Sequence, residues 1–78
     1  MLVSERKALK VTVQRSDDLD AVLGYFSGTA YDAEPVDERT IAVTPPDSVT
    51  RRLARREVDI YLRLLERLLP GVVATLVD

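Results

Sequence analysis

The sequence predicts an α+β domain in two layers, with an antiparallel sheet on one side and two helices on the other. Residues 9–14 and 40–44 alternate apolar and polar side chains, as half-buried strands do. Residues 16–28 and 49–69 instead carry apolar side chains at helical spacing. The predicted order is strand, helix, strand, strand, helix in a three-stranded sheet, with residues 72–77 as a candidate fourth strand. An irregular docked tail is the alternative for that last segment.

The chain length sets the domain count and the margin of stability. With 78 residues the chain makes a single domain, which we assign to residues 1–78. At this size one core leaves only a thin margin of stability, and association with another chain is a common remedy. We therefore expect self-association or a place in a larger complex.

The first strand and the first helix follow from local patterns. Leucine and valine alternate with polar residues over 9–14, which predicts a strand with one buried face. Ser16 or Asp17 can then cap a short amphipathic helix that ends at Gly28. A helix of this length is too short to be stable alone, so it depends on packing against the sheet.

The middle of the chain predicts a β-hairpin. Residues 31–36 form its first arm, residues 37–39 a polar turn, and residues 40–44 its second arm. Pro35 marks the first arm as a sheet edge, because proline cannot donate a hydrogen bond to a neighbouring strand. Acidic residues on the same arm also discourage pairing with other strands.

The long helix at 49–69 has an unusually wide apolar surface. Asp47 or Ser48 can cap its start, and Pro70-Gly71 ends it. At ~100° per residue its apolar side chains cover roughly 220°, whereas one sheet covers ~100° or a little more. The excess is expected to face something other than the sheet, either the first helix or another molecule. It is centred on Val58, Leu62, Leu65 and Leu69.

The net charge of −2 is unevenly distributed, with arginines in the long helix and acids earlier in the chain. Asp59 can pair with Arg55, Arg56 and Arg63 at helical spacing, and Glu66 can pair with Arg63. These charges therefore predict an exposed face of ion pairs. The small net charge argues against nonspecific nucleic-acid binding as the main function, although one basic face can touch a phosphate backbone.

Glu57 is an exception on this helix because it projects within the apolar arc. A carboxylate there needs a hydrogen-bond donor, either Tyr61 or an arginine from a neighbouring chain. The alternative, which we favour, is an overhanging position in contact with solvent.

The composition excludes several classes of chemistry. The chain contains neither cysteine nor histidine, so it offers no thiolate, no imidazole base and no zinc site of the usual ligand types. Asp17, Asp18 and Asp20 are better explained as first-turn charges that favour the helix dipole. We expect no enzymatic activity and no cofactor.

The amino terminus lacks the apolar core of a signal peptide, and no apolar run approaches the ~20 residues of a membrane helix. We thus expect a cytoplasmic protein that binds no membrane.

The hairpin and the long helix together resemble a known family. Thr40-Ile41-Ala42-Val43-Thr44 leads through Asp47-Ser48 to an arginine and then to Val58-Asp59-Ile60-Tyr61-Leu62-Arg63. This order is similar to the small dimerising subunit of the archaeal and eukaryotic KEOPS complex. The last helix of that family typically reads arginine, a few residues, and valine-asparagine-serine-tyrosine-leucine-arginine. The matching residues here are Arg55, Val58, Tyr61, Leu62 and Arg63, whereas Asp59, Ile60 and the segment 70–72 depart from the family.

The resemblance implies a noncatalytic dimerisation and scaffold subunit in a complex that makes threonylcarbamoyladenosine in tRNA. The domain would pair through its sheet with a second copy or with a paralogue, and its helices would pack on helices of the catalytic threonylcarbamoyltransferase subunit. The implied partner-binding residues are Val58, Tyr61, Leu62, Leu65 and Leu69. The implied contacts to RNA or to the interface rim are Arg55, Arg63 and Arg67.

A different function is compatible with the same layout. Ferredoxin-like modules of the ACT type bind small molecules in regulation or drive oligomerisation, and a true strand at 72–77 would favour this hypothesis. Such modules usually place a glycine between the first strand and the first helix, where a ligand meets the backbone. Here that loop reads Arg15-Ser16-Asp17-Asp18, which weighs against the hypothesis.

Overall fold

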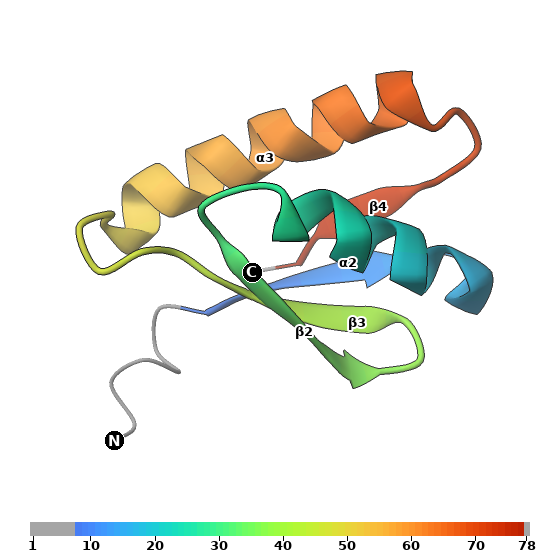
Figure 1. Ribbon diagram of the computed structural model, residues 1–78, viewed down its shortest axis with the longest axis horizontal. Coiled ribbons are helices and arrows are strands. Elements are labelled where there is room, and N and C mark those ends of the chain that lie inside the picture. Colours follow the sequence, from blue (N-terminus) through green and yellow to red (C-terminus); the bar gives the residue numbers. More distant parts are fainter. Residues whose placement is uncertain (1–7, 78) are drawn as a thin grey trace.

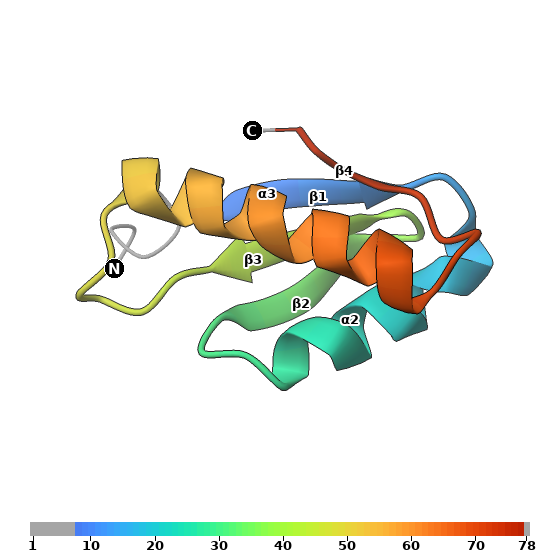
Figure 2. The same ribbon diagram turned by 90° about the horizontal axis from the view of Figure 1, so that it is seen from above.

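The computed structural model describes residues 8–77 and confirms the α+β architecture. A four-stranded sheet forms one layer, and two helices cover one of its faces (Figure 1, Figure 2). Residues 1–7, where we expect no signal peptide, lie outside the described residues, as does Asp78. The elements are β1 (Leu9–Val13), the 3-10 turn η1 (Ser16–Asp18), α2 (Leu19–Ser27), β2 (Asp32–Asp37), β3 (Thr40–Thr44), α3 (Arg51–Leu68) and β4 (Ala74–Leu76).

The sheet has the strand order β2-β3-β1-β4, and all neighbouring strands are antiparallel. Strand β1 lies in the interior, where Val11 is opposite Ile41 of β3 on one side and Leu76 of β4 on the other. With the two helical connections, this is the ferredoxin-like split βαβ arrangement. Residues 74–76 therefore form a strand, which settles the choice between a fourth strand and a docked tail.

The β2–β3 hairpin also follows the prediction, with its first arm one residue later than expected. Strand β2 is at the edge of the sheet, and its pairing with β3 is irregular between Pro35 and Asp37. In the turn, the Asp37 carboxylate accepts a hydrogen bond of 2.9 Å from the backbone N–H of Arg39. This bond stabilises the charged carboxylate and lowers the pKa of Asp37 below its usual value.

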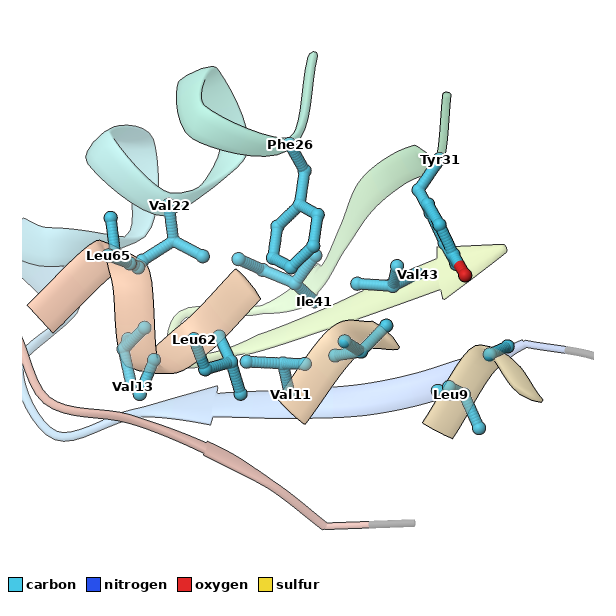
Figure 3. Packing of buried hydrophobic residues seen from close by; sticks show 13 residues of the cluster. Leu9, Val11, Val13, Val22, Phe26, Tyr31, Ile41, Val43, Leu62 and Leu65 are labelled. Carbon is cyan, nitrogen blue, oxygen red and sulfur yellow. The ribbon is translucent and has the colours of Figure 1, made fainter. Parts of the chain in front are cut away.

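The hydrophobic core fills the space between the sheet and the two helices (Figure 3). Phe26 of α2 is fully buried among the side chains of the alternating strand positions. Burial of each large apolar side chain contributes about 1.5–3 kcal/mol relative to exposure, so this single layer of contacts supplies most of the stability. The core consists of Leu9, Val11, Val13, Val22, Phe26, Tyr31, Ile41, Val43, Ala54, Val58, Leu62, Leu65 and Ala74.

The helix starts differ from the predicted caps. For α3, the expected caps Asp47 and Ser48 are wrong, because the Thr50 hydroxyl accepts a 3.2 Å hydrogen bond from the Leu53 N–H. A turn closed by Val49 N–H and the Pro46 carbonyl (3.0 Å) delays the start of this helix. For α2, the expected caps Ser16 and Asp17 are also wrong, because Ser16–Asp18 form the 3-10 turn and no side chain caps the helix.

The end of α3 follows the prediction. The last helical residue is Leu68, and the backbone of Gly71 has φ 102°, in the left-handed region that glycine adopts without strain. This glycine lets the chain reverse and return as β4 alongside the sheet (Figure 2).

Candidate functional site

Helix α3 is the most distinctive surface of the domain because it carries two separate apolar stripes. The first stripe packs on the sheet and consists of Ala54, Val58, Leu62 and Leu65. The second is exposed and consists of Leu53, Ile60, Leu64 and Leu68; we call it the α3 ridge. A charged side separates the two and consists of Arg55, Arg56, Asp59, Arg63 and Glu66.

The structure corrects the predicted orientation of α3. Val58, Leu62 and Leu65, which we expected to face away from the sheet, are 0–5% exposed in the core. Figure 3 shows Leu62 and Leu65 among the buried side chains. Tyr61 is partly buried against the core, and Leu69 follows the helix with 39% exposure. Of the five predicted partner-binding residues, only Leu69 is therefore exposed. The exposed apolar surface of α3 is the ridge.

Aromatic packing explains why α3 takes this orientation. The ring of Tyr61 makes edge-on contacts with Tyr25, Phe26 and Tyr31, with ring centroids 5.6–6.3 Å apart. Such edge-to-face pairs add about 0.5–1.5 kcal/mol beyond the area that they bury. They draw the Tyr61 side of α3 toward α2 and so leave the ridge in solvent.

A hydrogen bond between distant residues reinforces the same orientation. The Tyr31 hydroxyl donates to Oε1 of Glu57, across 26 positions of sequence. Burial raises the pKa of Tyr31 above its ordinary value, and the hydrogen bond to the Glu57 carboxylate raises it further. Within the chain the donor to Glu57 is thus Tyr31 and not Tyr61, and Glu57 is partly buried instead of fully overhanging. No spacing in the sequence indicates that Tyr31 and Glu57 lie close together.

The α3 ridge extends along most of the helix, although the charged residues Arg56 and Glu57 lie between Leu53 and Ile60. Its members are 46%, 54%, 46% and 66% exposed in chain order. At 1.5 Å per residue the stripe is ~22 Å long. An exposed apolar stripe of this kind is a candidate binding surface.

Arginines border the α3 ridge on one side. Arg56, Arg63 and Arg67 each follow a ridge residue by three positions, and all three are exposed. Residues three apart are neighbours on a helix surface. The ridge therefore combines an apolar stripe with a basic border.

The charged side of α3 faces β4 across an open groove. Arg63 and Asp59 form the predicted ion pair at 3.2 Å, with both side chains exposed. Of the residues predicted to touch RNA or an interface rim, Arg55 and Arg63 line this groove, whereas Arg67 is exposed in the last helical turn. The groove is lined by Arg55, Arg56, Asp59, Leu62, Arg63, Glu66, Ala74, Thr75 and Leu76.

Within residues 8–77, no group of three or more acidic side chains is placed to hold a metal ion. None of the helices in this range is long and apolar enough to cross a membrane.

Comparisons with known proteins return no match to a family model, to a curated protein or to a solved structure. The KEOPS resemblance therefore remains a prediction.

Proposed function

We propose that this domain is a noncatalytic scaffold subunit that binds a helix of a partner protein along the α3 ridge. The single observation that carries the proposal is the exposure of Leu53, Ile60, Leu64 and Leu68 on a helix whose other apolar stripe already covers the sheet. An amphipathic helix docks on such a stripe through apolar side chains three, four and seven positions apart.

The charges beside the ridge also indicate what kind of helix would bind there. The basic border of Arg56, Arg63 and Arg67 favours acidic residues beside the apolar stripe of the docked helix. Opposite charges at the rim raise the association rate and select the orientation of the partner more than they add affinity. The partner is thus a helix with an apolar face and acidic flanks.

The ridge alone is too small to hold a stable complex, so we expect it to form part of a larger interface. Its four side chains are about half exposed, so covering them contributes about 1 kcal/mol each. Association itself costs about 4–15 kcal/mol in lost freedom of motion. A stable complex therefore needs contacts beyond the ridge, which fits a subunit held in a multiprotein assembly.

The KEOPS resemblance supplies a specific partner for this proposal. In that case the docked helix belongs to the catalytic threonylcarbamoyltransferase subunit of a complex that modifies tRNA. The contact residues would be the ridge leucines and isoleucine in place of Val58, Leu62 and Leu65, which the core already uses. Arg55, Arg63 and Arg67 remain the candidate contacts to tRNA or to the rim.

Binding of the threonylcarbamoyltransferase subunit from the same organism, measured by calorimetry, tests the proposal. We expect Leu64→Glu to weaken binding about 30-fold or more, because it places a charge in the centre of the apolar contact. Val36→Glu is the matched control, since Val36 is an exposed apolar residue on β2 outside the ridge. If the wild-type domain does not bind, the assignment of this partner is wrong. If the two variants lose affinity equally, the assignment of the ridge as the binding surface is wrong.

One observation favours the second candidate, a small-molecule-binding module of the ACT type. The presence of β4 completes the βαββαβ order on which that hypothesis depends. The loop before α2 still lacks glycine. A rise in melting temperature with free amino acids would support this function over the scaffold.

A further inference from the structure

The outer edge of β4 is an unpaired strand edge. On the inner side of this strand, Val77 donates its backbone N–H to the Lys10 carbonyl (2.8 Å), so residue 77 pairs with β1. In an antiparallel ladder, residues that bond to one neighbouring strand alternate with residues whose backbone groups point the other way. The N–H and C=O groups of Ala74 and Leu76 therefore point away from β1. Within residues 8–77 no strand pairs with them.

The two edges of the sheet differ in their protection against an added strand. On the β2 edge, acidic side chains, Pro35 and an irregular pairing with β3 discourage one. On the β4 edge, residues 73–77 contain no charge and no proline. Because Ala74 faces the core, Val73 and Val77 point to the opposite face of the sheet, where they are 45% and 58% exposed. The β4 edge is therefore the one that favours pairing with another strand.

The groove between α3 and β4 lies beside this edge and gives room for the side chains of an added strand. Leu62 contributes an apolar side chain to its lining. Because the chain reverses after α3, Glu66 near the end of the helix lines the groove closer to the start of β4 than to its end (Figure 2). Within residues 8–77, Arg63 pairs with Asp59 at 3.2 Å and not with Glu66. The Glu66 carboxylate is thus open to a basic side chain from outside the domain.

We propose that the β4 edge and the groove bind an extended segment of another protein, which adds a fifth strand antiparallel to β4. The segment residues opposite Ala74 and Leu76 each exchange two backbone hydrogen bonds with them. Their side chains enter the groove, and the one opposite Ala74 is lysine or arginine, because Glu66 lies nearby. The segment residues opposite Val73 and Val77 are apolar and β-branched, so that they cover the two exposed valines.

The charge of Glu66 favours such a segment over a second copy of this chain. In a symmetric pair of two copies, the strand opposite β4 would consist of residues 73–77 themselves, which carry no charge in any register. Glu66 would then meet only apolar or hydroxyl side chains from that strand. A segment with lysine or arginine supplies the cation, and an exposed charge pair of this kind raises affinity up to about 5-fold.

This inference goes beyond the ridge and does not depend on it. Leu64 of the ridge and Glu66 of the groove are two positions apart, which places them ~200° apart around the helix. Strand addition therefore leaves the ridge free, and it supplies a contact of the kind that a stable complex needs beyond the ridge. The Leu64→Glu variant should bind the segment normally, so the two proposals fail independently.

An end-capped heptapeptide of sequence Ser-Val-Thr-Thr-Lys-Val-Ser is the probe for the full chain. Bound antiparallel, it places its lysine opposite Ala74 and its valines opposite Val73 and Val77. Nuclear magnetic resonance measures amide hydrogen exchange during a titration to about 5 mM peptide. We expect the N–H groups of Ala74 and Leu76 to exchange about 10-fold more slowly with the peptide bound. The N–H of Val77 already bonds to β1 and should change little.

Two substitutions of Leu76 separate backbone pairing from side-chain contact. Leu76→Pro removes the outward N–H and places a ring at the edge, and it removes no bond to β1. Leu76→Ala shortens the side chain and keeps the N–H. We expect Leu76→Pro to weaken peptide binding at least about 10-fold and Leu76→Ala at most about 3-fold. Circular dichroism checks the fold of both, and equal losses in two folded variants overturn strand addition.

An exchange of charges tests the basic residue on the fold of the wild-type strand. A peptide with glutamate in place of lysine should bind the wild-type domain about 5-fold more weakly, and Glu66→Lys should reverse this preference. The same preference in both domains overturns the assignment of Glu66. Absence of binding at about 5 mM peptide overturns the proposal. A dimer whose Ala74 and Leu76 amides exchange slowly without peptide also overturns it, because a second copy then occupies the edge.

Discussion

Leu64 and Leu65 are neighbours in the sequence, yet one is 46% exposed and the other 1% exposed. They represent two apolar stripes of α3, the ridge and the stripe in the core. The stripes have similar composition, so hydrophobicity alone does not distinguish them. Their different environments show that an apolar residue on this helix has either a structural or a binding role, depending on how the helix is rotated.

The largest expected effect is a difference in folding stability between substitutions in the two stripes. Leu65→Ala removes a fully buried side chain and leaves a cavity, so it should destabilise the domain by about 2–5 kcal/mol. Leu64→Ala changes a half-exposed residue, and we expect a change within about 1 kcal/mol. Urea denaturation of both variants measures the difference. Similar losses for the two variants would contradict the described orientation of α3.

A smaller effect tests the hydrogen bond that helps to orient α3. The pKa of Tyr31 is raised above its ordinary value of 10.0, so the folded state keeps its hydroxyl neutral to higher pH than the unfolded state does. The stabilisation is fully present below pH 10 and is lost as the pH rises above it. At neutral pH, Tyr31→Phe should cost about 1–2 kcal/mol by removing the donor to Glu57.

The pH dependence of the melting temperature checks this prediction. Above pH 10 the wild-type domain should lose stability more steeply than the Tyr31→Phe variant. The melting temperature of the variant should still fall somewhat as the pH rises, because burial also raises the pKa of Tyr25. Parallel curves for the two proteins would show that the Tyr31 hydroxyl does not contribute to the fold.

The elements of the fold could be predicted because each depends on a local pattern. Alternation identified β1 and β3, whereas the β-branched residues at 72–77 indicated only a candidate fourth strand, with a docked tail as the alternative. Helix caps were less predictable, since Thr50 competes with Asp47 and Ser48 for the same role within four residues.

The candidate site could be predicted only in part. The wide apolar arc of α3 correctly indicated that the sheet leaves some of it uncovered. Which part remains exposed depends on Tyr61 packing against α2 and on the bond from Tyr31 to Glu57, both of which join distant positions. The groove beside β4 likewise requires the strand order, which local spacing does not contain.

We propose that the ridge, which is open in the free domain, becomes covered by a partner helix. Since the chain has no cysteine, Leu64→Cys and Leu65→Cys each introduce a single thiol that can be labelled. We expect the thiol at position 64 to react at least about 100-fold faster than the one at position 65, since buried thiols are inert. Adding the threonylcarbamoyltransferase subunit should then slow labelling at position 64. Equal rates at the two positions, or unchanged labelling at position 64 with the partner bound, would contradict the account.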